Sequence, residues 1–291
     1  MDRFRTLRFF AGSATALLLS FACLSAEDKP AEPPKLGWGD VGELAYVATS
    51  GNSEVNTLGF KNLLSRRWEN ALLEINAGGI RSRSTVTTHT VSSAGPPVDI
   101  AEDSDSSLTA EAYYANGKYS RDITKTFFWY GFAGWERNRF SGIENRTTVA
   151  GGVGNIWKDT DRVRFRTDYA LSYVDEEDVA EPPDFDGTYV AARLSSTYQQ
   201  KFGEVTTYGN DFMIEDDLND TTNWRGDMTN WVAVAMSARF SLKASLRWLY
   251  DHEPAQAAAS DPLGLLPPGE VAFFELDKLD TIFTTSLVVK F

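Results

Sequence analysis

Cysteine is almost absent from this chain, since Cys23 is the only one among 291 residues. It lies in the amino-terminal leader described below, so we expect a mature chain without disulfides. If the chain is exported, as its leader indicates, it must be stabilised by interactions other than disulfide bonds. Strand pairing is therefore expected to hold the fold together.

Long apolar runs are lacking as well. After the amino terminus, no stretch reaches the roughly 18 apolar residues that a membrane-spanning helix needs. Mean hydropathy is −0.30, yet aromatic residues make up 13% of the chain. Abundant aromatics at modest hydropathy are typical of a membrane β-barrel, in which only every second residue meets lipid.

Positive charge is scarce, because the formal net charge is −13. Removal of residues 1–26, which contain three Arg and one Asp, would change it to −15. Phosphate binding needs a basic surface, so this acidity argues against nucleic acid as a partner.

Histidine is represented only by His89 and His252. A lipid hydrolase needs a nucleophile beside a general base, and His89 with Ser92 or Ser93 is the one local arrangement of that kind. So few histidines also argue against a His-based metal site. We expect no catalytic residue, no cofactor and no metal, with a barrel lipid hydrolase as the alternative.

The amino terminus has the features of a secretory signal peptide. A short apolar run, Phe9–Phe21, follows three basic residues, which are Arg3, Arg5 and Arg8. We predict cleavage after Ala26, with lipidation at Cys23 as an alternative. Residues 27–36 are rich in Pro and charge, so they are predicted to form a disordered lead-in to a barrel domain over 37–291.

The chain ends on a strand with one apolar and one polar face. From Leu279 to Phe291 the alternate residues are mostly apolar, which is the period of two of a β-strand. Further segments of this kind are separated by turn residues, as in Ser50–Ser53, and we count twelve strands. They cover about 38–50, 55–66, 71–78, 107–120, 125–138, 146–157, 163–173, 190–198, 205–214, 225–238, 242–251 and 279–291.

The connections between these segments differ on the two sides. Every second one is short (67–69, 121–124, 158–161, 201–204 and 239–241), whereas most of the others are long and polar (85–105, 175–187, 215–224 and 253–275). Bacterial outer-membrane barrels have short periplasmic turns, longer outer loops and an even strand number. Strands of about ten residues also exceed those of a soluble sandwich. The sequence thus predicts an all-β, antiparallel transmembrane barrel of the outer-membrane type.

Two aromatic belts are expected at the two membrane interfaces. On the side of the short turns they comprise Trp38, Trp68, Trp157 and Phe291, and on the loop side Trp135, Tyr173, Trp248 and Tyr250.

Charged residues within strands are predicted to face the lumen, because a charge facing lipid at mid-depth costs about 2–4 kcal/mol. The candidates for lining a pore are Arg164, Arg166, Asp168, Lys243 and Arg247, and the same parity places Glu74, Asn76, Glu111, Glu136, Lys278 and Asp280 inside. Eight strands enclose a filled interior and sixteen leave a channel. Twelve falls between, so an open pore and a filled barrel both remain possible.

Acidic residues are concentrated in two predicted loops. One holds Asp175, Glu176, Glu177, Asp178, Glu181, Asp184 and Asp186, and the other Glu215, Asp216, Asp217 and Asp220. Carboxylates at this density could collect Ca²⁺ or Mg²⁺ and bridge to lipopolysaccharide. The calcium-loop pattern is missing, so a solvated acidic surface is the simpler interpretation.

The stretch Glu43–Ser53, followed by Thr57 and Leu58, resembles the opening strand and Ser-Gly-Asn-Ser turn of a family of salt-induced outer-membrane proteins. The resemblance implies an envelope barrel without assigned catalytic residues and a link to salt or osmotic stress. We expect a non-enzymatic protein of the bacterial outer membrane, such as a narrow channel. A lipid-modifying enzyme and a surface binder acting through acidic loops are the alternatives. Expected partners are outer-membrane lipid, lipopolysaccharide and the barrel-assembly machinery, which would read the strand ending in Phe291.

Overall fold

The computed structural model describes residues 35–49, 53–93, 99–139, 141–180, 186–258 and 273–291. Side chains are described for these residues except at 47–49, 53–55, 84–93, 99–110, 257–258 and 273. The predicted signal peptide, its cleavage site and almost all of the lead-in lie outside the described residues. The described part contains no helix long and apolar enough to cross a membrane.

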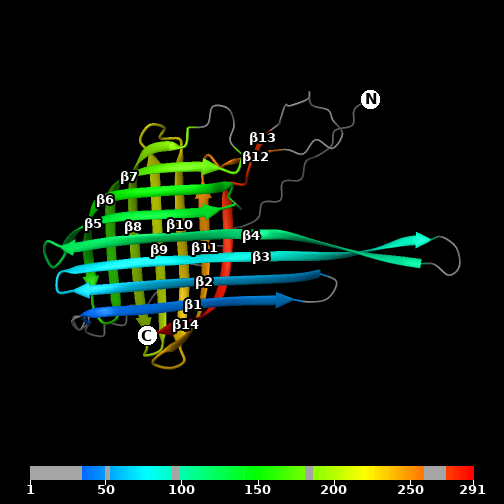
Figure 1. The fold of residues 1–291 in the computed structure, drawn as a ribbon. Helices are drawn as coiled ribbons and strands as arrows, with labels where there is room; N and C mark the ends of the chain where they lie inside the picture. The colour runs from blue at the N-terminus through cyan, green and yellow to red at the C-terminus, as the bar shows by residue number, and fades with distance from the viewer. Residues whose placement is uncertain (1–34, 50–52, 94–98, 140, 181–185, 259–272) are drawn as a thin grey trace, which may run out of the picture.

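Twelve antiparallel strands close into one barrel, in the order β1-β14-β11-β10-β9-β8-β7-β6-β5-β4-β3-β2 (Figure 1). Each barrel strand pairs with its sequence neighbours, and β14 closes the ring against β1. The barrel strands are β1 Gly37–Thr49, β2 Ser53–Trp68, β3 Ala71–Ser93, β4 Asp99–Asp122, β5 Phe127–Asn138, β6 Ile143–Asp159, β7 Val163–Asp178, β8 Thr188–Phe202, β9 Thr206–Asp217, β10 Trp224–Ala235, β11 Phe240–Asp251 and β14 Leu279–Lys290. This confirms the predicted fold class and strand number.

Two features extend beyond the ring. The short strands β12 (Gln256–Ala258) and β13 (Phe273–Glu275) pair with each other between β11 and β14. The hairpin of β3 and β4 continues well past the rest of the barrel (Figure 1). A loop was predicted at 85–105, and this was wrong, because β3 runs to Ser93 and β4 begins at Asp99. The β-branched run after Ser84 sustains the pairing although its polar composition hides the alternation.

The outer face of the barrel is apolar. Large hydrophobic side chains alternate with interior-facing ones and stay exposed, among them Leu44, Phe60, Leu171, Val232, Leu242 and Phe283. A soluble protein would bury such a continuous apolar surface. Each strand thus turns one side to lipid, as a transmembrane barrel requires.

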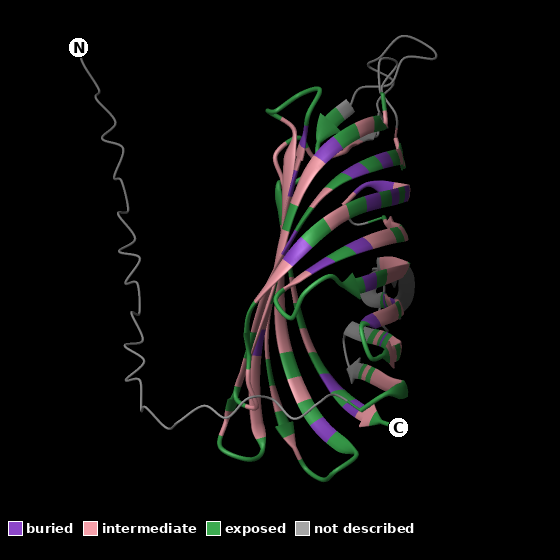
Figure 2. Ribbon diagram, turned by 90° about the vertical axis from the view of Figure 1, so that its left-hand side faces the viewer, coloured by how far each residue is buried: buried purple, intermediate pink, exposed green. Residues whose placement is uncertain are grey.

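Buried residues form separate bands along the strands and no continuous apolar block (Figure 2). The largest side chains that are almost completely buried are Glu215, Val174 and Ser172, which all lie toward the loop ends of their strands. The densest packing is therefore in the loop-side half of the interior.

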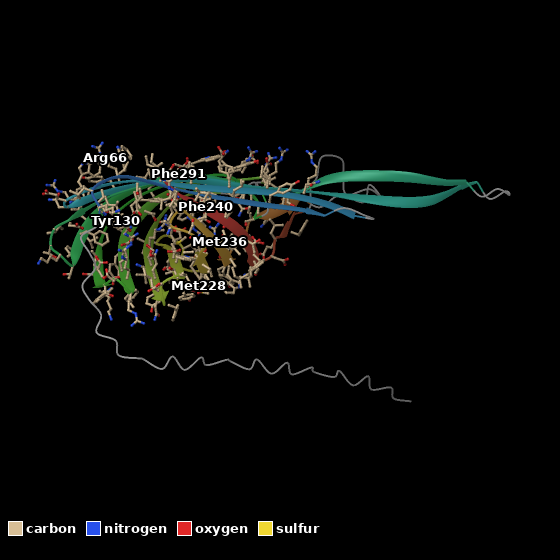
Figure 3. All side chains as sticks on the ribbon, turned by 90° about the horizontal axis from the view of Figure 1, so that it is seen from below. Arg66, Tyr130, Met228, Met236, Phe240 and Phe291 are labelled. Atoms are coloured by element: carbon tan, nitrogen blue, oxygen red, sulfur yellow. The ribbon has the colours of Figure 1, made fainter. Side chains whose placement is uncertain are left out.

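Aromatic side chains surround the outer face near the short turns. Trp68 and Trp129 both pack against Tyr119, with ring centroids 6.4 and 5.7 Å away. The guanidinium of Arg66 lies over Trp38 at 5.1 Å and over Trp68 at 4.9 Å. In Figure 3, Arg66 and Phe291 lie on the outside of the sheet, whereas Tyr130 lies on its inner side.

On the loop side, the outer face carries Trp135 and Tyr173, both exposed. There Trp224 packs on Tyr250 at a centroid distance of 4.7 Å. The two predicted aromatic belts thus lie at opposite ends of the lipid-facing surface.

Candidate functional site

The interior of the barrel is the candidate functional site, because most strands direct charged side chains into it. Arg166, Asp168, Lys243 and Arg247 face inward, as parity predicted. Arg164 has the same parity but lies at the turn-side rim, where its side chain is 60% exposed and 3.3 Å from Asp159. It therefore belongs to the rim and does not join the interior network.

Two ion pairs link β7 to strands across the interior. Lys118 of β4 bonds Asp168 of β7, and Arg166 of β7 lies 3.8 Å from Glu74 of β3. Neither strand is a neighbour of β7 in the barrel. The ammonium group of Lys118 also lies 4.1 Å from the ring centre of Tyr130. These contacts bring opposite charges of distant strands together inside the barrel.

The other two predicted bases are paired near the closing strands. Lys243 donates to Glu43 at 2.8 Å across β14, and Ser286 of β14 bonds the other oxygen of Glu43 at 3.4 Å. Arg247 donates through two nitrogen atoms to Asp227 at 3.0 and 2.6 Å. Both bases are thus held by specific carboxylates.

A denser network occupies the loop-side half of the interior. Arg146 of β6 donates to both oxygens of Glu176 at 2.6 Å and to Glu136 at 3.1 Å. Glu136 lies 3.9 Å from Arg225 of β10, and Arg146 lies 4.0 Å from Asp251 of β11. Because β5 and β6 lie opposite β10 and β11 in the ring, this network crosses the lumen.

Glu215 is the most buried member of this network, with 2% of its surface exposed. It accepts hydrogen bonds from Ser172 and from Arg225, the latter at 2.8 Å, and lies 3.8 Å from Arg193. The guanidinium of Arg193 in turn lies 5.0 Å from the ring centre of Phe132 on β5. A buried carboxylate needs this number of partners to stay charged.

A cavity of about 210 Å³ lies beside this network. Its polar lining includes Lys118, Arg166, Asp168, Arg193, Asp211 and Asp227. Two of the lining groups, Arg166 Nε and Asp168 Oδ1, are buried without a hydrogen-bond partner. Polar atoms in this position are suited to bind water or a polar solute.

The mouth on the loop side is covered by two connections. Ser141, in the turn between β5 and β6, bonds Asp280 of β14 at 2.6 Å. A Cβ added at Gly142 in the same turn would lie 2.5 Å from Ala255 and 2.9 Å from Leu276, which flank the β12–β13 hairpin. These residues come from opposite sides of the ring, so the contacts span the mouth.

Six charged residues of the network were not among the candidates for lining the lumen: Arg146, Glu176, Arg193, Glu215, Arg225 and Asp251. Glu215 was assigned to an acidic loop, but β9 continues to Asp217 and buries it. The signal that could have identified it is its parity with Met213 and Asp211 on β9.

The acidic loops are smaller than predicted, because Asp175–Asp178 belong to β7 and Glu215–Asp217 to β9. In the described loops, hydrogen bonds from the hydroxyl and N–H of Thr188 lower the pKa of Asp186. Thr222 lowers the pKa of Asp220 in the same way. Both carboxylates are thus engaged in local turns, whereas Glu181 and Asp184 lie outside the described residues.

The prediction that Glu111 faces the lumen was wrong, because its side chain faces outward. Tyr114 and Lys118 on the same strand face inward at even positions, which places odd positions on the other face. Glu111 is 3.5 Å from Arg139, another outward residue. Three other residues of this prediction form hydrogen bonds. Asn76 donates to Asn116 and Lys278 to the His252 carbonyl, and Asp280 accepts from Ser141. The rule that charges face inward fails at Glu111, because Arg139 pairs with it on the outer face.

The two histidines lie in different surroundings. His252 stacks on Trp224 at 5.9 Å, and its Nδ1 is 3.1 Å from the Tyr250 hydroxyl. His89 lies within β3, not in a loop, and its side chain is outside the described residues. No group of three or more His, Cys, Asp or Glu able to hold a metal occurs in the described part of the chain.

Several solved barrels resemble this one in fold. The NanC porin is 11% identical, with 87% of this chain and 98% of that chain covered at a TM-score of 0.44. The KdgM porin in complex with disordered oligogalacturonate is 7% identical, with 87% of this chain and 99% of that chain covered at a TM-score of 0.42. The translocator domain of the autotransporter NalP from Neisseria meningitidis is 11% identical, with 89% of each chain covered at a TM-score of 0.41.

Comparison with curated proteins gives no match. A family model does match, over residues 42–291, and it therefore includes β1 from Gly42, all the other strands and the interior charges described above. The chain belongs to the family described as protein of unknown function, DUF481.

Proposed function

We propose that this protein is a non-enzymatic, narrow channel of the bacterial outer membrane, constricted on its loop side in the present conformation. The observation that carries the proposal is the charged network that crosses the lumen, in which Glu136 of β5 lies between Arg146 and Arg225. Opposite charges on facing walls provide a polar route that ions and small polar solutes can follow.

An ionic interior is not needed to fill a barrel. Replacing buried ion pairs by packed apolar residues is often neutral or stabilising, because desolvation offsets much of the attraction between the charges. The interior nevertheless carries ion pairs from β1 to β11, together with a polar cavity. This arrangement favours a water-containing pathway over a purely structural filling.

The proposed location follows from the apolar exterior together with the predicted signal peptide. We propose that the barrel-assembly machinery reads the closing strand β14 together with Phe291, which follows it and is 83% exposed. The resemblance of Glu43–Ser53 leads us to propose a role in salt or osmotic stress as well. It is compatible with a channel that passes ions.

The first test is the conductance of the refolded mature protein in a planar bilayer at two salt gradients. We expect discrete steps with a reversal potential set by the gradient. Glu136→Ala should give larger steps and shift selectivity toward anions, because it removes the carboxylate shared by Arg146 and Arg225. Glu177→Ala is the matched control, since Glu177 bonds Asn145 on the outer face.

Folding of each protein would be checked by circular dichroism. Silent bilayers from folded wild-type protein and folded Glu136→Ala would overturn the channel proposal. Equal effects of Glu136→Ala and Glu177→Ala would show that the interior network does not control conduction.

A further inference from the structure

The outer face carries a local group of four arginines, named here the arginine patch: Arg81 and Arg83 on β3, Arg137 on β5 and Arg139 just after β5. Arg81 and Arg83 alternate with Ser82, which faces inward and bonds Thr57 at 2.7 Å. All four therefore point away from the lumen. They lie on the loop side, where Arg137 and Arg139 are at the end of β5. Arg81 and Arg83 lie beside them on β3, before its extension to Ser93.

The depth of the patch follows from β4, which runs between β3 and β5. Arg121 and Glu111 both point outward on β4. The four outward residues between them are uncharged: Tyr119, Gly117, Ala115 and Tyr113. Ten residues span about 33 Å along a strand, and a tilt of about 40° reduces this to ~25 Å, the height of the apolar band of such barrels. Because Arg81 pairs in register with Glu111, the patch lies at the level of the lipid headgroups.

The aromatic belt supports this placement. Trp135 is the outward residue of β5 immediately before Arg137, and it is 38% exposed. Tryptophan prefers the interface between headgroups and acyl chains. Arg137 and Arg139 therefore begin where the apolar band ends.

Part of the patch is held in place by carboxylates. Glu144 accepts hydrogen bonds from Arg137 and from Arg139, the latter at 2.8 and 3.1 Å, and Arg139 lies 3.5 Å from Glu111. Arg137 Nε is buried without a hydrogen-bond partner. The two guanidinium groups are thus fixed side by side with donors to spare, because each has five.

Positive charge remains in excess. Among the described side chains, four arginines face two carboxylates, Glu111 and Glu144, and neither Arg81 nor Arg83 forms an ion pair with any of them. The adjacent outer face has the opposite sign, since Asp175 and Glu177 of β7 point outward at the same end. The basic surface is therefore confined to β3–β5 and is suited to an anionic partner.

We propose that the arginine patch binds the phosphates of a phosphorylated glycolipid of the outer leaflet. Guanidinium groups pair with phosphate through two parallel hydrogen bonds, which an ammonium group does not match. The two arginine pairs lie on strands separated by two spacings, about 10 Å, which suits a sugar headgroup phosphorylated at both ends. This inference rests on the outer-membrane location in the proposed function, but it does not depend on conduction.

The outer face toward the membrane centre fits acyl chains. Below the patch, the ring of Tyr113 lies over Gly79. Beyond it, toward the membrane centre, β3, β4 and β5 carry small outward residues: Ala77, Ala115, Gly117, Gly131 and Ala133. A Cβ at Gly131 would meet nothing within 4 Å. Lipid chains can therefore lie close to the strands beneath a headgroup held by the arginines.

The test measures binding of bisphosphorylated lipid A to the purified full barrel in detergent by native mass spectrometry. The test variant replaces Arg81, Arg83, Arg137 and Arg139 by Gln. Its control, Arg66→Gln with Arg121→Gln, changes exposed arginines at the turn-side rim. Dephosphorylated lipid A and phosphatidylglycerol are compared with wild-type protein.

We expect the test variant to bind bisphosphorylated lipid A at least about tenfold more weakly, because several charge-assisted hydrogen bonds are lost. The control variant should bind like wild type, and dephosphorylated lipid A should bind weakly. Unchanged binding by the folded test variant would overturn the proposal, as would equal binding of phosphatidylglycerol by wild type. Conductance recorded on the same variants separates this failure from a failure of the channel proposal.

Discussion

Most interior charges described for this barrel lie within reach of an opposite charge on another strand. Glu215 shows why this is needed, since a carboxylate with 2% exposure would otherwise pay a large desolvation cost. Its partners Arg225 and Arg193 come from the two strands that flank β9. Alternation along β9 could have predicted that the Glu215 side chain points inward. Its hydrogen-bond partners could not be predicted, because they depend on the register of three strands.

Small residues matter where strands approach each other in the interior. A Cβ at Gly152 would lie 2.0 Å from the Tyr169 carbonyl oxygen and 2.8 Å from Ala170 Cα. We expect Gly152→Ala to lower the free energy of unfolding by about 1–3 kcal/mol, because backbone atoms must move to make room. Urea unfolding of the refolded barrel, followed by tryptophan fluorescence, measures this change.

Gly151 supplies the control, since its Cβ would meet nothing within 4 Å. Gly151→Ala should alter the free energy of unfolding by no more than about 0.5 kcal/mol. Equal destabilisation by the two substitutions would contradict the predicted difference between the inner and outer faces.

At the scale of elements, the closing seam differs from the other strand pairs. β14 forms eleven register pairs with β11 but only four with β1, from Leu44↔Leu287 to Val41↔Lys290. β1 in turn forms thirteen pairs with β2. The loop-side half of β14 therefore has a full ladder of pairs on one side only.

We predict that backbone amides of residues 279–286 exchange hydrogen faster than those of 287–290. Amides without a ladder partner are protected less, and local opening begins where pairing is sparse. Hydrogen–deuterium exchange of the barrel in lipid nanodiscs measures this, with β11 as the internal control because both its edges are paired. Uniform protection along β14 would show that the seam is closed over its whole length.

Strand existence was more predictable than strand length. All twelve barrel strands overlap the segments expected from alternation, because the period of two is a local property of each segment. The errors occurred at strand ends, as at Asp175–Asp178 and Glu215–Asp217, where acidic composition resembles that of a loop. Pairing with a neighbouring strand, as between Asp216 and Trp224, overrides that local composition.

For the whole molecule, the sidedness of the barrel is directly testable. In a Cys23→Ser background, Asn219→Cys in the β9–β10 loop should react with a membrane-impermeant maleimide on intact cells. Glu204→Cys in the β8–β9 turn should react only after the outer membrane is permeabilised. Both positions are exposed in described connections at opposite ends of the barrel, and bacterial barrels turn their short connections to the periplasm.

Labelling of Glu204→Cys on intact cells, with Asn219→Cys protected, would reverse the proposed orientation. It would also place the arginine patch in the inner leaflet, where lipid A is absent. The experiment therefore tests the membrane side of the patch independently of lipid binding.

The sequence by itself determined the class of fold, the strand number and the apolar exterior with its two aromatic belts. These properties follow from alternation and turn residues, which act between neighbours in the chain. Only the tertiary structure decided which charges meet, as with Lys118 and Asp168, or Arg225 and Glu136. Such partners come from strands far apart in the chain, and closure of the ring brings them together across the lumen.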